Sequence, residues 1–279
     1  KHRNYDALLT PNHRVLYQPK EFYEREENNW KVKFASNVNG KEYLPLIGNG
    51  VADSVALLKD EIVALIGWII TEGCYEKDTI TITQYKKNGR KTIEELLVAL
   101  NISYSIKGKK KDFKIHQNDA RKIRSLLPKK ELTVDFLYKC NRKQLQILFD
   151  TLIAGDGTVT KTSIHFIQAN KNTIDVFQIL CTMIGKSSRV SERIFKEEHQ
   201  HYGSKQIFIV SVKQSKYASQ FKISKEKYIG KVWCPDLKNG TVIIFSSLTY
   251  LNTFKVNIII NRITRDKDIN LIKGINNPK

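Results

Sequence analysis

The sequence predicts an α+β protein built from two copies of one module, and three observations lead to this fold class. Two apolar, helix-like runs, residues 65–73 and 149–157, each place an acidic residue directly before glycine. The two acids, Glu72 and Asp156, stand 84 positions apart, and a glutamine follows each of them after 12 residues. Between acid and glutamine the residues alternate in polarity, as in a strand. This register of helix, acid and strand indicates an internal repeat.

Each helix-like run carries two small residues one helical turn apart, Gly67 and Thr71 in the first and Thr151 and Gly155 in the second. Small residues at this spacing share a helix face, so we expect the two helices to pack closely. Packing would bring the two acids together at the negative ends of the helix dipoles. Like charges repel there unless a cation lies between them, and hard oxygen ligands suit Mg²⁺.

Each run taken singly also suits an ordinary buried helix, whose C-terminal glycine supplies a left-handed turn. The two runs occur as a matched pair, which favours a shared metal site over two unrelated helix ends.

A period-2 pattern follows each acid and predicts one strand at 79–84 and another at 163–168. The inward faces are Ile80, Ile82 and Gln84 in the first strand and Ile164, Phe166 and Gln168 in the second. The outward faces are Thr79, Thr81 and Thr83 in the first strand and Ser163, His165 and Ile167 in the second. Short polar side chains on a twisted ribbon can read base edges in a major groove, although threonine is also common on any exposed strand.

Helices are expected next, at 92–100 and 173–180, each with a threonine N-cap. Strands should follow over 102–116, interrupted by a lysine-rich turn, and over 188–195 paired with 206–212. The loop 196–205 holds His199 and His201. A polar loop is favoured over a zinc site there, because a third ligand is missing.

The charge of the chain predicts a polyanionic partner. There are 47 Lys and Arg against 28 Asp and Glu, a formal net charge of +19, and residues 84–143 hold 17 basic and 6 acidic residues. Such clusters favour phosphate contact, with DNA or RNA as the partner. Much of this charge is expected on strands and turns. The candidate phosphate-contacting residues are Lys86, Lys87, Arg90, Lys107, Lys109, Lys110 and Lys111.

Other sequence features favour an intracellular protein of the cytoplasm or nucleoid, without a membrane partner. No run of eighteen apolar residues occurs, and no charged-then-apolar leader is found at the start. The cysteines, Cys74, Cys140, Cys181 and Cys234, are scattered and are expected to be reduced thiols.

The paired helix-acid-glycine segments resemble the LAGLIDADG homing endonucleases. The resemblance implies two αββαββα modules, at 54–140 and 141–228, that offer a saddle of antiparallel strands to duplex DNA. It further implies a monomeric enzyme that uses Mg²⁺, Mn²⁺ or Ca²⁺ and hydrolyses one phosphodiester per strand at a long asymmetric site. The metal positions it implies are Glu72, Asp156, Gly73 and Gly155. The first copy departs from the usual pattern by carrying Glu72 in place of Asp.

The resemblance also implies supporting catalytic residues. Gln84 and Gln168 would position metal-bound water near the acids. Family enzymes place a basic residue near each metal, for which Lys130 is the candidate in the first copy and Lys222 in the second.

The two ends of the chain resemble blocks of the Hint domain of inteins. Thr10 and His13 match the early block that polarises a splice junction, and residues 228–241 match a late block. Residues 1–50 and 229–279 would then form one discontinuous β-rich domain. We expect no self-splicing, because no Cys or Ser opens the chain and no His-Asn pair closes it.

Three alternatives to an endonuclease stay open at this stage. A protein-splicing element would depend on Thr10, His13 and terminal residues, whereas an RNA-binding intron maturase would bind RNA whether or not the acids were intact. A DNA-binding regulator that does not cleave is the third, although such proteins often lose the paired acids.

Overall fold

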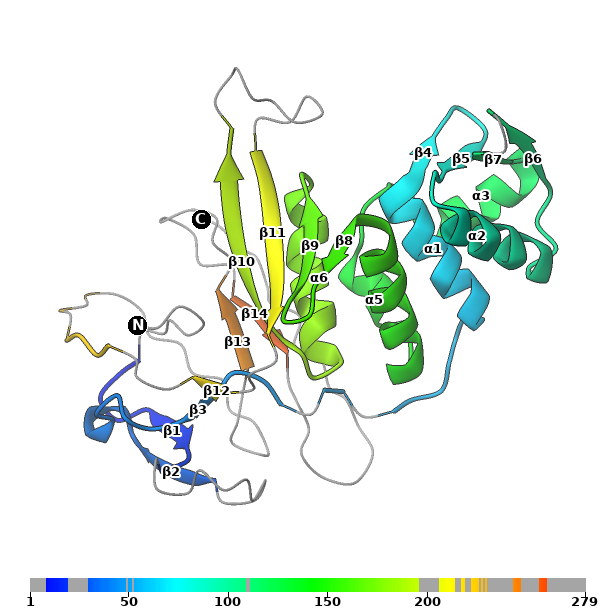
Figure 1. Ribbon diagram of the computed structural model, residues 1–279. Coiled ribbons are helices and arrows are strands. Elements are labelled where there is room, and N and C mark those ends of the chain that lie inside the picture. Colours follow the sequence, from blue (N-terminus) through cyan, green and yellow to red (C-terminus); the bar gives the residue numbers. More distant parts are fainter. Residues whose placement is uncertain are drawn as a thin grey trace.

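The computed structural model describes residues 9–19, 30–48, 50–51, 53–108, 111–195, 206–213, 217–218, 222–225, 227, 229, 243–246 and 256–259. Within them, helices and antiparallel sheets alternate along the chain (Figure 1), which confirms a mixed class with antiparallel strands. The helices are α1 (Asp60–Glu72), α2 (Lys87–Ala99), α3 (Gln117–Leu126), α4 (Val134–Leu137), α5 (Arg142–Asp156) and α6 (Lys171–Met183).

Two four-stranded antiparallel sheets have the same strand order. The strands lie in the order β4-β5-β7-β6 in the first sheet and β8-β9-β11-β10 in the second. In each sheet the fourth strand along the chain therefore lies between the second and the third. The first sheet contains β4 (Gly73–Tyr75), β5 (Ile80–Thr83), β6 (Tyr104–Lys107) and β7 (Asp112–Ile115). The second contains β8 (Gly157–Val159), β9 (Ile164–Gln168), β10 (Ser187–Ile194) and β11 (Gln206–Lys213).

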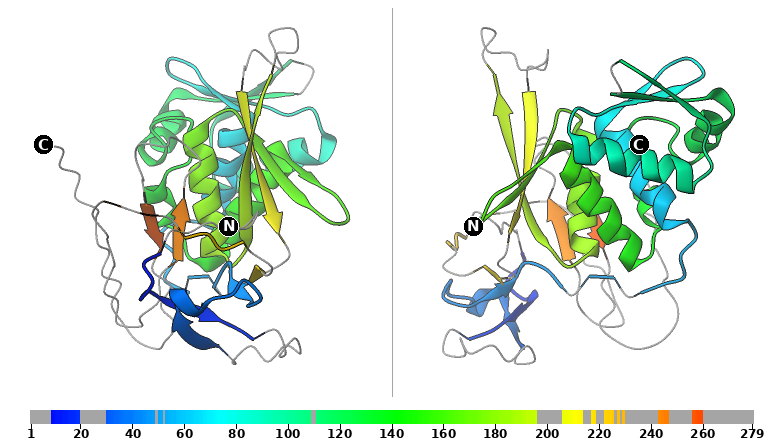
Figure 2. Two further views of the ribbon diagram at one scale, coloured as in Figure 1. Left: turned by 90° about the vertical axis from the view of Figure 1, so that its left-hand side faces the viewer. Right: turned by 45° about the vertical axis from the view of Figure 1, so that its right-hand side comes forward.

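The inward faces of both sheets bury apolar residues against the helices. Ile80 and Ile82 of β5 are 0 % exposed, and Phe166 of β9 stacks on Phe177 of α6 with ring centroids 4.2 Å apart. Each such side chain contributes about 1.5–3 kcal/mol when fully buried. Figure 2 shows α1 and α5 side by side in the centre, with the two sheets on either side of them. The alternation predicted from sequence thus places the correct faces inward.

The strands predicted around the lysine-rich turn and in the second copy are confirmed. β6 and β7 form a hairpin whose turn includes Gly108 at φ +60°, a left-handed conformation that favours glycine. β10 and β11 pair along their full lengths, from Ser187 opposite Lys213 to Ile194 opposite Gln206. Residues 196–205, with His199 and His201, lie outside the described residues.

The predicted threonine N-caps are wrong, because both helices begin earlier. α2 starts at Lys87, so Thr92 lies inside it and its hydroxyl donates to the Asn88 carbonyl at 3.1 Å. α6 is capped by Asn170, whose side chain accepts a hydrogen bond from the Thr173 backbone at 2.8 Å. Asparagine is the stronger cap, and the N-cap residue of α2, Lys86, makes no side-chain cap hydrogen bond.

Shorter pairings lie outside the two large sheets. β1 (Arg14–Tyr17) pairs with β2 (Lys31–Phe34), β3 (Leu44–Pro45) with β12 (Tyr217–Ala218), and β13 (Ile243–Ser246) with β14 (Val256–Ile259). They are β-rich, as expected for the flanks, and their membership of a Hint-like domain stays a prediction. The late block at 228–241 and Cys234 lie outside the described residues, apart from position 229.

The candidate splicing residues lie at a turn before β1, where the His13 backbone donates to the Thr10 carbonyl at 3.0 Å. Nearby, Glu42 is 4 % exposed and accepts hydrogen bonds from Lys33 and from the Asn39 and Gly40 backbone. This carboxylate therefore holds the turn before β3 together.

Three cysteines fall in the described part of the chain, and all three are free thiols: Cys74 is exposed, whereas Cys140 and Cys181 are buried. Among the helices described, none combines the length and the apolar character needed to cross a membrane.

Candidate active site

The site begins with the contact between α1 and α5, where small residues let the backbones approach. A Cβ placed on Gly67 would lie 2.8 Å from the Thr151 methyl carbon, and one on Gly155 would lie 2.2 Å from the Thr71 hydroxyl. Glycine therefore faces threonine twice, in opposite senses. The small-residue contact predicted from sequence is confirmed.

The same two helices are tied together at their N-terminal ends. Gln144 forms a capping box with Asn141, and its side-chain amide donates to the Leu58 carbonyl at 2.6 Å and to Asp60 at 3.0 Å. Lys143 adds an ion pair to Asp60 at 2.6 Å. Asp60 and Gln144, which contact each other, are also 84 positions apart, the offset that relates Glu72 to Asp156.

Glu72 and Asp156 end these helices and are the next equivalent pair. The charge of Glu72 acts on Asp156: burial and then Glu72 raise the pKa of Asp156 to about 6, against the lowering influence of Lys130, Lys86 and Gln168. Two carboxylates thus share a partly buried site at the negative ends of two helices. The structure brings them together as the sequence predicts.

Each acid is held by the glutamine that follows it by 12 residues. The Gln84 amide donates to Glu72 at 3.0 Å, while its carbonyl oxygen accepts from the Lys86 backbone at 2.9 Å, which fixes the amide orientation. Gln84 is 2 % exposed and lies against Gly89, where a Cβ would be 2.8 Å from its Cγ. In the second copy, Gln168 donates to Asp156. The spacing seen in the sequence is therefore a hydrogen-bonded unit.

Two lysines bring positive charge to this centre. Lys130 donates to the Thr71 carbonyl at 3.3 Å, and both Lys130 and Lys86 lower the pKa of Asp156. Lys86 was expected among the phosphate contacts of the outer surface, and its place beside the acids was missed. Its signal in the sequence is its position two residues after Gln84. Lys222 is exposed within the short described stretch 222–225, and its catalytic role stays a prediction.

The two helix-ending glycines are required by close approach rather than by a left-handed turn. Gly73 and Gly157 have φ of −84° and −97°, which any residue can adopt. A Cβ on either would lie 2.4 Å from a carbonyl oxygen of its own helix, that of Ile69 or Ile153. The ordinary left-handed C-cap considered above is therefore wrong. The family resemblance implies metal positions at Gly73 and Gly155, but the 84-residue offset relates Gly155 to Thr71 and Gly157 to Gly73. Gly73 and Gly155 are therefore not matching positions.

The donor chemistry at this centre fits a hard divalent cation. Carboxylate oxygens of Glu72 and Asp156 repel each other, and a cation between them would relieve that repulsion. Among the described residues, no third His, Cys, Asp or Glu completes a metal-binding group. The remaining ligands would be carbonyl oxygens, water or phosphate, a set that Mg²⁺ accepts.

Thr79, just before β5, and Thr81 and Thr83 of β5 donate hydrogen bonds to nearby carboxylates, which the sequence did not predict. Thr79 and Thr81 donate to Glu76 at 2.8 and 2.7 Å, and Thr83 donates to Asp112 at 2.8 Å. Hydrogen bonds from Lys114, Thr81 and Thr79 lower the pKa of Glu76 to about 2. This face therefore presents an ordered network with two carboxylates, in place of the free threonine surface that was expected.

The second sheet carries different side chains on its outward face. His165 of β9 and Ser211 of β11 are opposite each other, with His165 Nδ1 and Ser211 Oγ 3.0 Å apart. Ser163 precedes β9 and its hydroxyl lies 2.8 Å from that of Thr160, within a turn. No carboxylate accepts from either of these two predicted DNA-binding residues in the described hydrogen bonds.

The basic residues divide between a helix and a hairpin. Lys87 and Arg90 lie in the first turn of α2, not on the strand or turn predicted, because the helix begins at position 87. Lys107 ends β6, and the Lys111 ammonium lies 4.5 Å from the Tyr85 ring centroid. Lys109 and Lys110 lie outside the described residues.

A hollow of about 440 Å³ beside α1 is lined by Trp68, Lys86, Lys87, Asn88, Gly89, Thr92 and Ala154.

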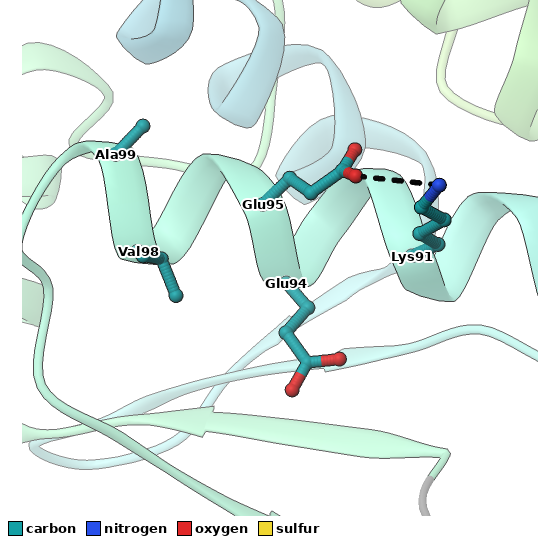
Figure 3. A pocket seen from close by; sticks show the side chains of 5 residues that line it. All are labelled: Lys91, Glu94, Glu95, Val98 and Ala99. Carbon is teal, nitrogen blue, oxygen red and sulfur yellow. Dashed lines mark ion pairs between the residues drawn. The ribbon is translucent and has the colours of Figure 1, made fainter.

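A second hollow lies on the far part of α2, away from the basic first turn (Figure 3). Glu94, Glu95 and Lys91 project from this helix, and Lys91 pairs with Glu95 at 3.7 Å. Val98 and Ala99 supply its apolar lining. Its mixed charge does not suit a phosphate backbone, so the basic surface of α2 is confined to its start.

Comparisons with known proteins give low similarity. No family model and no curated protein sequence matches this chain. Among solved structures, mesophilic variants of the homing endonuclease I-DmoI align at 15 % identity with a TM-score of 0.40, over 56 % of this chain and 89 % of that one. I-DmoI in complex with DNA and Mn aligns at 16 % identity with a TM-score of 0.39, over 55 % and 89 %. Full-length DUF199/WhiA from Thermatoga maritima aligns at 12 % identity with a TM-score of 0.37, over 58 % and 54 %.

Proposed function

We propose that this chain is a divalent-metal-dependent DNA endonuclease that hydrolyses one phosphodiester in each strand of a long duplex site. One observation carries the proposal: Glu72 and Asp156 end two helices packed through Gly67, Thr151, Thr71 and Gly155, and each acid is held by its own glutamine. Two matched carboxylates at one centre provide one acid for each strand of a duplex.

Duplex DNA is the proposed partner because of charge and sheet geometry. The chain carries a net charge of +19, which favours a polyanion. Each acid is followed directly by the first strand of a four-stranded antiparallel sheet, and strands can enter a DNA groove. The proposal treats the two sheets as halves of one pseudo-symmetric saddle, from residues 54–140 and 141–228. Their side chains differ, so the recognised site should be asymmetric.

The residues of the centre have separable roles in the proposed reaction. A divalent cation, most simply Mg²⁺, would polarise the scissile phosphate and lower the pKa of the attacking water when bound. Gln84 and Gln168 orient the carboxylates through their amide donors. Lys130 and Lys86 place positive charge beside Asp156, where it can offset charge that develops on a phosphate.

Further parts of the proposal concern the rest of the chain. A monomer should suffice, because both modules are in one polypeptide. We propose an intracellular location, where DNA is found. The flanks, with Thr10 and His13, would be a Hint-like frame.

A cleavage screen tests the proposed activity. A randomised duplex DNA library incubated with the protein and Mg²⁺ should yield recurrent double-strand breaks, and EDTA should abolish them. Glu72→Gln and Asp156→Asn should each reduce cleavage at least a hundredfold while leaving binding to the recovered duplex. Asp150→Asn, on the exposed face of α5, is the matched control and should cut normally.

The outcomes separate the alternatives. A folded protein that cuts no duplex contradicts the proposal. Binding of structured RNA in preference to duplex DNA, unchanged by Glu72→Gln, would favour an RNA maturase. Sequence-specific DNA binding without cleavage would favour a regulator.

A further inference from the structure

The two large sheets differ most at one pair of equivalent positions on their outward faces. In the first sheet, Thr83 of β5 lies opposite Asp112 of β7 and donates to it at 2.8 Å. In the second sheet, the residue 84 positions after Thr83 is Ile167, and it lies opposite Ile209 of β11. The hydrogen-bonded pair Thr83 and Asp112 of the first sheet is thus replaced by two isoleucines in the second sheet.

The isoleucine pair belongs to the outward face of its sheet. Its neighbours along the strands, Phe166 of β9 and Phe208 and Val210 of β11, are buried at 0–5 % exposure on the face that packs against the helices. Because successive strand residues alternate between faces, Ile167 and Ile209 point the opposite way. Both are partly exposed.

The apolar pair extends into a row bounded by polar and basic residues. Ile209 lies opposite Ser191 of β10, so the row is Ser191, Ile209 and Ile167 across three strands. On the edge strand β10, Arg189 and Arg193 lie two residues to either side of Ser191, and both are exposed. Two cations at the edge can contact phosphates on both sides of a base step that meets the apolar row.

We propose that Ile167 and Ile209 read the 5-methyl group of thymine, so that one half of the DNA site is selected for thymine at the step they contact. This inference rests on the proposed function and adds a specificity to it. In the major groove thymine alone among the four bases presents a methyl group, and apolar side chains are its usual contact. In the first sheet, the Asp112 carboxylate offers an acceptor to cytosine amino groups instead.

The test compares thymine with uracil, which differs only in lacking the methyl group. A duplex recovered by binding from a randomised library is resynthesised with deoxyuridine in place of thymidine, in one half of the site at a time. Loss of one buried methyl should weaken binding about fourfold, from about 0.8 kcal/mol per methylene-sized group. We expect that loss in one half only.

Two variants locate the effect. Ile167→Ser combined with Ile209→Ser removes every side-chain methyl group at these two positions and should bind the thymine and uracil duplexes equally in that half. Val32→Ser, a comparable exchange of a β-branched apolar residue for serine at an exposed position of β2, should keep the fourfold preference.

The failures are distinguishable. If no duplex is enriched from the library, DNA recognition itself fails, and this inference with it. If a duplex is bound and cut but uracil costs nothing in either half, or the double serine variant still prefers thymine, only the methyl-reading role of the isoleucines is overturned.

Discussion

Gly155 of α5 lies directly against Thr71 of α1, so close that a Cβ on Gly155 would fall 2.2 Å from the threonine hydroxyl. Gly155→Ala should therefore force the helices apart and lower the free energy of unfolding by about 1–3 kcal/mol, as overpacking does. Urea unfolding measures this. The swap Thr71→Gly with Gly155→Thr repeats the Gly67–Thr151 arrangement and should recover much of the loss. A swap no more stable than Gly155→Ala would contradict the contact.

Asp156 should make the protein less stable as pH rises. Its pKa is raised to about 6 from an ordinary value of 3.8, so the folded state binds its proton more tightly than the unfolded state. The resulting stabilisation is complete below pH 4 and is lost as pH rises through 6. Asp156→Asn should thus stabilise the protein at pH 7.5, by about 1–3 kcal/mol, and much less at pH 4.

Urea unfolding of both proteins at the two pH values, without divalent metal, checks this window. The control is Asp150→Asn, on the same helix but exposed, which should change stability little at either pH. Equal stabilisation by Asp156→Asn at pH 4 and 7.5 would contradict a raised pKa of Asp156 in the folded protein.

Gln84 should contribute more than Gln168 to the free energy of unfolding. Gln84→Met removes two part-buried hydrogen bonds, the one its amide donates to Glu72 and the one its carbonyl oxygen accepts from the Lys86 backbone, from a side chain that is 2 % exposed. The loss of two such bonds should cost about 1–3 kcal/mol. Gln168→Met removes the described bond to Asp156 from a partly exposed residue and should cost less.

On the proposed function, each of these variants should also slow one strand cut more than the other. Nicking of a duplex labelled separately on its two strands measures this. Equal slowing of both cuts by Gln84→Met would contradict a division of the centre between the two acids.

Glu76 should restrain DNA binding by the first sheet. Its carboxylate accepts from Thr79, Thr81 and Lys114, so it occupies three groups that could otherwise contact DNA. Glu76→Gln removes a negative charge from this face and weakens the interaction between residue 76 and Lys114. Affinity for random duplex DNA should rise, and the slope of log affinity against log salt should steepen by about 1.

Glu95→Gln is the matched control for this change of charge, because Glu95 lies on the outer face of α2 with Lys91. It should leave the salt slope nearly unchanged. A Glu76→Gln protein with unaltered salt dependence would mean that DNA does not approach this face.

Local pattern was sufficient for much of the fold. Alternation placed Ile80, Ile82 and Phe166 inward, because a strand that buries one face must alternate. The 84-residue offset identified the helix contact, since equivalent small residues of two copies meet where the copies pack. Cap positions were less predictable, because threonine and asparagine compete for the same role and only Asn170 takes it in α6.

The sequence by itself determined a register, in which two acids 84 positions apart are each followed by a glutamine after 12 residues, and this register predicts two copies of one module. Tertiary structure alone decided which partners those side chains meet. Lys86 reaches the acids because α2 begins beside Gln84, and the threonines of β5 are engaged because Glu76 and Asp112 come within hydrogen-bond distance through a turn and a neighbouring strand. Such contacts depend on distances across the fold, which no periodicity along the chain encodes.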